Sequence, residues 1–159
     1  MSIRMALAAL VVGSACFAAP VAHAEDCRFT QGYWQNHAQN VPGTSTIWSF
    51  LSQQPFYQSG MTYAQVLLVA PRGNAYWILA HQLVAAEANQ AIGADPSGDP
   101  AQAISVAQQL MRTYTPAQIN ALPKSDQVSQ DMIYIASILD KWNNGLIGTG
   151  ICVAGGGNN

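Results

Sequence analysis

The sequence predicts an all-α fold, and three observations lead to this prediction. Three helix starts carry an oxygen-bearing residue followed three positions later by glutamine, which is the pattern of a capping box, and they begin at Thr62, Asp99 and Thr115. Apolar residues further along recur at the spacing of one helix face. No strand-like alternation is sustained anywhere. We therefore expect a compact multi-helix bundle around a central apolar helix.

The first half of the chain predicts three short helices and then the central one. The short helices are expected over 31–37, 45–51 and 62–69, and Pro71 separates them from the central helix. The segment 73–92 predicts that helix, because its apolar residues lie on more than one face. Its many alanines favour helix formation and allow neighbouring helices to approach closely.

The second half predicts three further helices. Pro100 and Pro116 follow the caps at Asp99 and Thr115, where the missing N–H of proline costs nothing. Ser125 is the expected cap of the last helix. The predicted core face of the helix after Asp99 is Ile104, Ala107, Leu110, Met111 and Tyr114. The predicted core face of the last helix is Val128, Met132, Ile135, Ala136, Leu139 and Trp142. An Asn-Gly stop at 144–145 explains the oxygen-rich end of the last helix better than a calcium loop does.

The amino terminus predicts an export signal. Arg4 precedes an apolar stretch over 5–20, and small residues at Val21-Ala22-His23-Ala24 predict cleavage after Ala24. A retained anchor is disfavoured because the stretch is shorter than the roughly 20 residues that span a bilayer. A lipoprotein signal at Cys16 would need a larger aliphatic residue in place of Gly13. The chain then divides into a signal peptide (1–24), a single helical domain (25–154) without a membrane span, and a disordered tail (155–159).

Two cysteines stand near opposite ends of the predicted mature chain. A disulfide between Cys27 and Cys152 would join the termini and would stabilise the domain by roughly 4 to 5 kcal/mol in the chain-entropy model. Two free thiols or an intermolecular pair are the alternatives. The pairing and the signal together predict an oxidising location, which is periplasmic, cell-surface or extracellular.

Composition and motifs exclude several classes of function. The chain has six Lys and Arg against eight Asp and Glu, for a net charge of −2, and its basic residues are scattered singly. Nucleic-acid binding needs clustered basic residues, so that class is discarded. No GxSxG elbow, P-loop or dinucleotide fingerprint is present, and no cofactor is expected. The uncharged polar residues favour a glycan or an envelope or extracellular protein as the partner.

Three segments resemble a known kind of domain. Residues 27–37, CRFTQGYWQNH, resemble the opening of a bacterial secreted domain with the signature CxxTQGYWKNH. Gly73-Asn74, AHQLVAA at 80–86 with Asn89, and LDKWNNG at 139–145 resemble its middle and end. Gln35 replaces the usual lysine, and Trp142 stands where tyrosine is common. The resemblance implies exposure outside the cytosol and assigns no reaction.

Residues within these motifs are the candidate binding site. His37 lies four positions after Tyr33 and three positions after Trp34, so the three rings can cluster on one helix. The cluster either forms a recognition platform for sugars or proteins, or Trp34 fills the core while Asn36 and His37 cap backbone groups. The full set of candidate binding residues is Tyr33, Trp34, Asn36, His37, His81, Gln82 and Asn89.

His81 lies on the most apolar helix and therefore needs a polar partner. A structural hydrogen bond is the expected solution. The alternatives are a metal site that joins His81 and His37 to Glu87 or Asp140, and a small secreted hydrolase that uses the same groups. No HExxH or CxxC motif supports a metal. We expect a non-catalytic binding or structural module.

Overall fold

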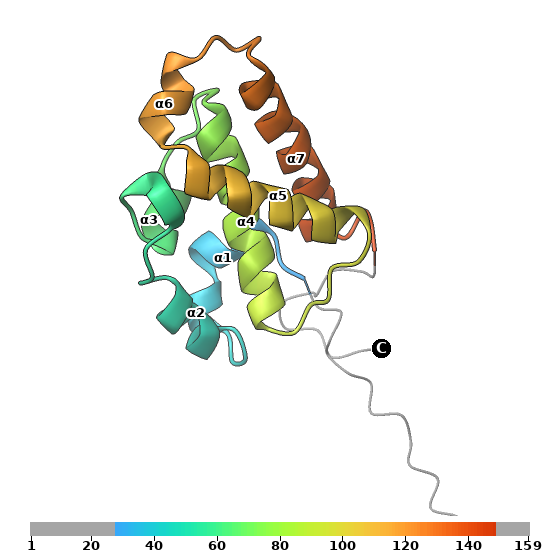
Figure 1. Ribbon diagram of the computed structural model, residues 1–159. Helices are drawn as coiled ribbons and strands as arrows, with labels where there is room; N and C mark the ends of the chain where they lie inside the picture. Colours follow the sequence, from blue (N-terminus) through green and yellow to red (C-terminus); the bar gives the residue numbers. More distant parts are fainter. Residues whose placement is uncertain (1–27, 149–159) are drawn as a thin grey trace, which may run out of the picture.

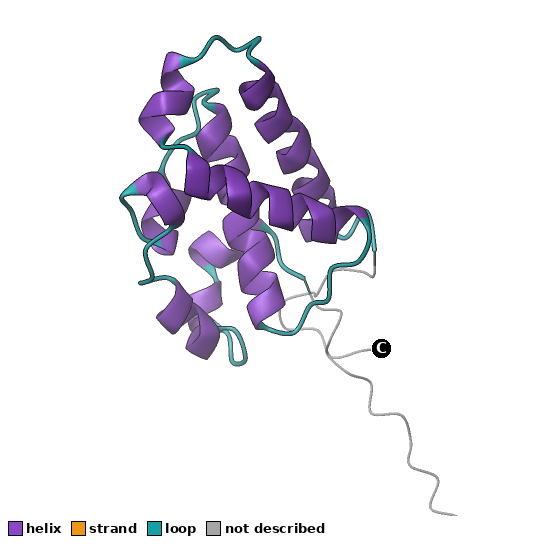
Figure 2. Cartoon of the chain, viewed as in Figure 1, coloured by secondary structure: helices purple, strands orange, loops and turns teal. Residues whose placement is uncertain are grey.

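The computed structural model describes residues 28–148. Within this range the chain forms seven α-helices and two short 3₁₀ helices, with no strand (Figure 1). Figure 2 shows the helices joined by loops along the whole described chain. The predicted all-α fold class is confirmed. The signal peptide, the tail, Cys27 and Cys152 lie outside the described residues, so the disulfide stays a prediction.

Helix α4 (Ala75–Ala91) is the central element, and it contacts each of the other six helices. Most of its side chains are buried on all sides, as expected for a helix without a polar face. Ala80, Ala85, Ala86 and Ala88 are wholly buried, so neighbouring backbones pack closely against them. The central apolar helix is therefore where the sequence predicted it.

Two long helices pack against α4 and against each other. They are α5 (Asp99–Thr113) and α7 (Gln127–Asn143), and α5 crosses in front of α4 in Figure 1. Their predicted core faces are buried or partly buried, with Met111, Met132 and Leu139 fully inside. The short helix α6 (Pro116–Ala121) links them and also contacts α4.

The remaining helices are short and pack around α4. They are α1 (Gln31–Asn36), α2 (Ser45–Leu51) and α3 (Tyr63–Leu68), with 3₁₀ turns η2 (Ala38–Asn40) and η3 (Tyr57–Ser59) between them. In Figure 1 all three short α-helices lie to the left of α7. None of the helices within residues 28–148 is both long and apolar enough to cross a bilayer.

Two of the three predicted capping boxes are confirmed, at Thr62 and Thr115, with both reciprocal hydrogen bonds present. The box at Asp99 is wrong. Gly98, at φ 61°, takes the cap position and its carbonyl accepts from Gln102 N, so Asp99 becomes the first helical residue.

The predicted cap of the last helix is also wrong by one residue. Asp126 caps α7 in place of Ser125, and its Oδ1 accepts from Val128 N at 2.9 Å. A carboxylate is the stronger acceptor at the positive end of a helix, which explains the shift.

Helix α7 ends at the predicted Asn-Gly stop. Gly145 adopts φ 68°, and two amide donors close the end, from Gly145 to Trp142 O at 3.0 Å and from Leu146 to Lys141 O at 2.8 Å. Just beyond this turn, Arg28 Nη1 donates to Ile147 O at 2.9 Å. The Arg28 guanidinium also lies 5.2 Å from the Trp142 ring centroid. The two ends of the described chain are thus in contact.

Candidate functional site

Asn89 is a wholly buried side chain that connects the start of the described chain to two helices. Its Oδ1 accepts hydrogen bonds from Phe29 N at 2.8 Å and from Trp34 Nε1 at 3.1 Å. Its Nδ2 donates to Phe29 O at 2.9 Å and to Asn143 Oδ1 at 3.0 Å. All four hydrogen-bonding positions of the amide are therefore used inside the protein.

The network continues from Asn143 to the surface. Asn143 Nδ2 donates to both Gln82 O and Gln82 Oε1 at 3.0 Å. Gln82 Nε2 in turn donates to Asp140 Oδ1 at 3.0 Å. A chain of amides thus joins the 27–37 segment, α4 and α7, which are the three segments that carry the resemblance. Three of the predicted binding residues, Trp34, Gln82 and Asn89, are held by this internal network.

The predicted aromatic cluster forms, and most of it is buried. Trp34 is 0% exposed and packs edge-on against Phe29 and Tyr33, with ring centroids 5.9 and 5.7 Å away. Trp48 lies 5.5 Å from it on another side. Of the two interpretations for Trp34, its burial supports the one in which it fills the core. No face of its indole is open to a ligand.

The outer part of the same cluster reaches the surface. His37 is exposed and its ring centroid lies 6.0 Å from that of Tyr33, while Phe29 is partly buried and stacks on Tyr33 at 3.9 Å. Asn36 is also exposed, and its Nδ2 donates to Gly32 O at 3.0 Å. His37, Asn36 and the edge of Phe29 are therefore accessible to a partner, and we call them the α1 edge.

His81 is buried, and it forms the structural hydrogen bond that the sequence predicted. Its Nε2 lies 2.9 Å from Val66 O on helix α3. Burial lowers the pKa of His81, and hydrogen bonds to the carbonyls of Val66 and Val69 oppose this shift in part. Among residues 28–148, no three side chains of His, Cys, Asp or Glu lie close enough together to hold a metal ion.

Glu87 is the single charged residue on α4, and it accepts hydrogen bonds from three side chains. Tyr57 and Gln108 Nε2 both donate to Oε1, the latter at 2.8 Å, and Tyr63 donates to Oε2 at 2.6 Å. The Arg112 guanidinium lies 5.3 Å from the centroid of the Tyr57 ring. The carboxylate is thereby fixed between α3, α4, α5 and η3.

Burial raises the pKa of both Tyr57 and Tyr63 above the usual value of a tyrosine. The negative charge of Glu87 and the hydrogen bonds to it raise both further, while Arg112 acts in the opposite direction on Tyr57. The sequence indicated Glu87 only as a possible metal ligand or hydrolase carboxylate, and it did not indicate the two tyrosines. A single carboxylate on a largely buried helix needs hydrogen-bond donors, and this is the signal that could have indicated a structural role. Which donors meet the carboxylate depends on the packing of distant segments.

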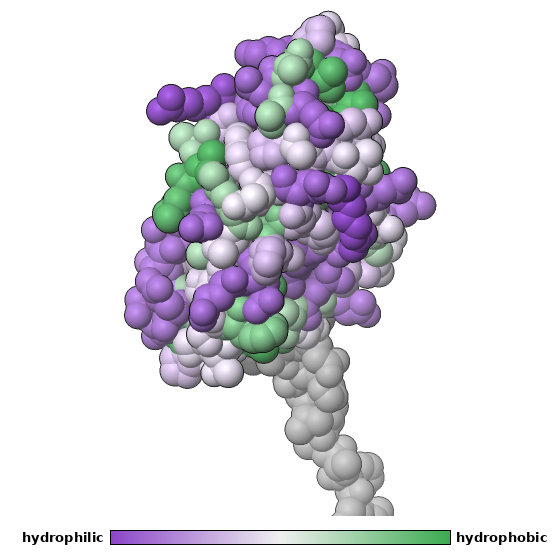
Figure 3. Space-filling view, turned by 60° about the vertical axis from the view of Figure 1, so that its left-hand side comes forward, coloured by the Kyte–Doolittle hydropathy of each residue, from purple (hydrophilic) through white to green (hydrophobic). Residues whose placement is uncertain are grey.

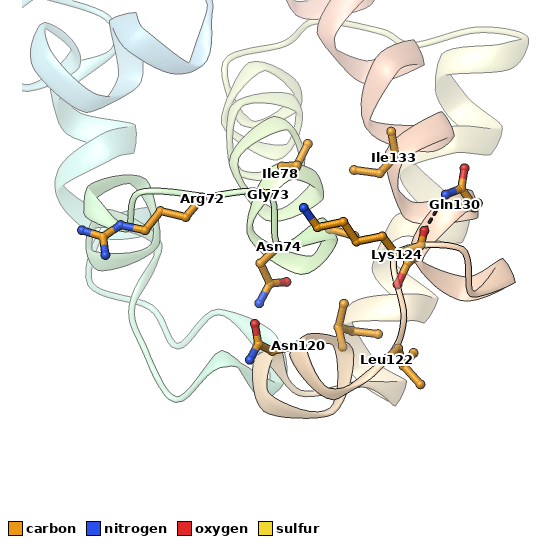
Figure 4. A pocket seen from close by; sticks show the side chains of 12 residues that line it. Arg72, Gly73, Asn74, Ile78, Asn120, Leu122, Lys124, Gln130 and Ile133 are labelled. Atoms are coloured by element: carbon orange, nitrogen blue, oxygen red, sulfur yellow. Dashed lines mark hydrogen bonds between the residues drawn. The ribbon is translucent and has the colours of Figure 1, made fainter.

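A cavity of about 420 Å³ opens beside the first turns of α4 and α7 and the end of α6. Figure 4 shows Lys124 extending its ammonium group toward Gly73, while the Arg72 guanidinium points the other way. Asn74 and Asn120 face each other at one side, and Ile78 and Ile133 lie at another. No local sequence pattern indicates this cavity, because residues between 72 and 78 and residues between 119 and 133 assemble it.

These features define a small all-helical domain in which buried amides bond to one another and two tyrosines bond to Glu87. No family model, no curated protein and no solved structure matches the chain. Its function therefore has to be inferred from its own residues.

Proposed function

We propose that this protein is an exported, non-catalytic binding or structural module of the cell envelope or extracellular space. We also propose that it belongs with the bacterial secreted domains that its 27–37 segment resembles. The observation that carries the proposal is the buried network around Asn89. Three candidate binding residues of the resemblance, Trp34, Gln82 and Asn89, are each bonded within that network.

The candidate acid and base groups also have separate structural partners. His81 is bonded to Val66 O, Glu87 to two tyrosines and Gln108, and Asp140 to Gln82. A small secreted hydrolase or a metal-binding protein would need several of these groups, or His37, to face one substrate or ion. Their separate engagement supports the binding module over that alternative.

The surface fits an uncharged polar partner. Figure 3 shows a face on which hydrophobic residues form small separate groups among hydrophilic ones. The α1 edge combines rings with polar groups, an arrangement that suits stacking on a sugar or anchoring a protein. We propose that a glycan or an envelope protein binds through this edge.

A binding screen against immobilised glycans and purified envelope proteins tests this proposal. The variant His37→Ala with Asn36→Ala should bind at least several-fold more weakly than wild type, with an unchanged melting curve. Gln109→Ala, at an exposed position on α5, is the control and should bind as wild type does. Equal binding by the double variant and by Gln109→Ala would contradict the proposed role of the α1 edge in binding. Turnover of a substrate that disappears in a folded His81→Ala variant would favour the hydrolase.

The export and disulfide predictions have their own test. The secreted protein should begin at Glu25, and Cys27 and Cys152 should resist alkylation until a reductant is added. A lipid on Cys16, or two thiols that react without reductant, would contradict these predictions.

A further inference from the structure

The cavity beside α4 has the dimensions of a small-molecule site. Its volume of about 420 Å³ lies within the range of pockets that enclose small ligands. It is formed by the loop before α4, the end of α6 and the start of α7. None of these residues belongs to the α1 edge, so the two surfaces can be tested separately.

Ser129 offers a hydroxyl group to the cavity. The residue is 6% exposed and lines the cavity from the first turn of α7. Within the described part of the chain its hydroxyl makes no hydrogen bond, whereas Ser137, farther along α7, donates to Tyr134 O at 2.7 Å. Ser129 Oγ is also not among the fully enclosed atoms that lack a hydrogen bond within residues 28–148, so this hydroxyl is open to the cavity. A group inside the cavity can therefore form a hydrogen bond with it.

Lys124 brings a positive charge to the same space. Its Nζ lies 3.5 Å from the point where a Cβ of residue 73 would stand, next to the positive end of α4. No aspartate or glutamate lines the cavity, and among residues 28–148 no carboxylate forms an ion pair with this ammonium. The neighbouring Asp126 is engaged in capping α7. This placement favours an anion over a neutral or cationic ligand.

The rest of the wall is mixed, because four large aliphatic side chains line it together with Arg72, Asn74, Asn120 and Gln130. Ile78 comes from α4, Ile119 from α6 and Ile133 from α7, and Leu122 lies between α6 and α7. An inorganic anion would leave these side chains facing water. A ligand with an apolar body attached to its charge would cover them.

We propose that this cavity binds a small organic carboxylate with an apolar body of about five carbons. The carboxylate accepts hydrogen bonds from Lys124 Nζ and Ser129 Oγ, and the carbon chain lies against the isoleucines. Two sources offer this chemistry, which are a free short-chain carboxylic acid and the carboxyl terminus of a peptide that ends in an apolar residue. The site goes beyond the proposed binding role of the α1 edge and does not depend on it.

The first experiment uses wild-type protein and two probes of one shape. Hexanoate and hexanamide are titrated while backbone amide shifts are followed by NMR. Hexanoate should shift the amides of residues 73–75 and 129–133, with a dissociation constant in the millimolar range or below for about eight heavy atoms. Hexanamide should bind at least about tenfold more weakly, because it lacks the charge. Equal binding of the two, or no shift at these amides, would overturn the proposal.

The second experiment removes the two polar groups one at a time. Lys124→Gln and Ser129→Ala should each weaken hexanoate binding by about tenfold or more. Lys141→Gln and Ser137→Ala make the same changes on α7 outside the cavity and should bind hexanoate as wild type does. Because Ser129→Ala removes an unpaired hydroxyl, its melting temperature should not fall. Equal weakening in the cavity and control variants would overturn the assignment.

A third comparison separates the two sources of the carboxylate. N-acetyl-leucine imitates a peptide terminus, and tighter binding of this probe than of hexanoate assigns the site to peptide ends. The reverse order assigns it to free acids. N-acetyl-leucinamide is the neutral control, and if it binds as well as N-acetyl-leucine the carboxylate proposal fails.

Discussion

Asn89 on α4 and Asn143 on α7 are joined by a hydrogen bond of 3.0 Å between two side chains that are both 0% exposed. Asn89 also bonds to Phe29, which precedes α1, and Asn143 also bonds to Gln82, which lies on α4. Apolar side chains alone permit small shifts of one helix along another, whereas this pair has one arrangement in which all its groups are satisfied. The pair therefore fixes how the two long helices and the first described residues fit together.

Replacing Asn89 by alanine should destabilise the protein severely. Asn89→Ala leaves the Trp34 indole N–H, both backbone groups of Phe29 and Asn143 Oδ1 without their partner in the core. We expect a loss of about 4 kcal/mol in the free energy of unfolding, measured by urea denaturation. Asn36→Ala, at an exposed position, should change it by less than about 0.5 kcal/mol. Similar losses in both variants would contradict the role of the network.

Two tyrosine-to-phenylalanine changes should have opposite effects. The Tyr76 hydroxyl is buried and has no hydrogen-bond partner among the described residues, so Tyr76→Phe should stabilise the protein by about 1 kcal/mol. Tyr63→Phe removes a donor to the Glu87 carboxylate and should destabilise it by about 2 kcal/mol. Thermal and urea unfolding measure both. A stabilising Tyr63→Phe would contradict the assigned hydrogen bond.

His81 should make the protein less stable in mild acid. Its pKa is lowered in the folded state, so below about pH 6.5 the unfolded chain takes up a proton that folded His81 does not yet accept. Stability is therefore greatest above that pH and falls as the pH drops toward the folded pKa. Urea midpoints between pH 7.5 and 5 should fall more for wild type than for His81→Gln. Parallel curves would show that His81 is not the responsible group.

Alkaline pH should unfold the protein through its buried tyrosines. The pKa values of Tyr57, Tyr63 and Tyr76 are all raised, chiefly by burial. An unfolded tyrosine ionises near pH 10, so above that pH the unfolded chain loses protons that the folded protein keeps, and stability falls. Absorbance at 295 nm should show these three tyrosines ionising together with the loss of helical circular dichroism. Ionisation of all three before unfolding would contradict the prediction.

Local sequence patterns predicted the helices well, because helix starts and stops depend on residues within a few positions of one another. The boxes at Thr62 and Thr115 and the stop at Gly145 are of this kind. The errors at Asp99 and Ser125 arose where a neighbouring residue also qualified as the cap. Gly98 and Asp126 took those positions, and a shift of one residue left the core faces unchanged.

The candidate sites were harder to predict, because they depend on which distant segments meet. The sequence marked Trp34 and Asn89 as unusual, and the structure joins them across 55 positions of chain. Nothing local in the sequence indicates that Tyr57 and Tyr63 reach Glu87, or that Lys124 and Ser129 share a cavity with Ile78. Such relationships arise from the packing of α4 against its neighbours.

The contact between Arg28 and Ile147 has a consequence for protein architecture. Because entry and exit lie on the same side of the bundle, residues 28–148 can be spliced into a surface loop of an unrelated host with little distortion of either partner. The helices would then project from the host as a self-contained appendage on two short connecting segments.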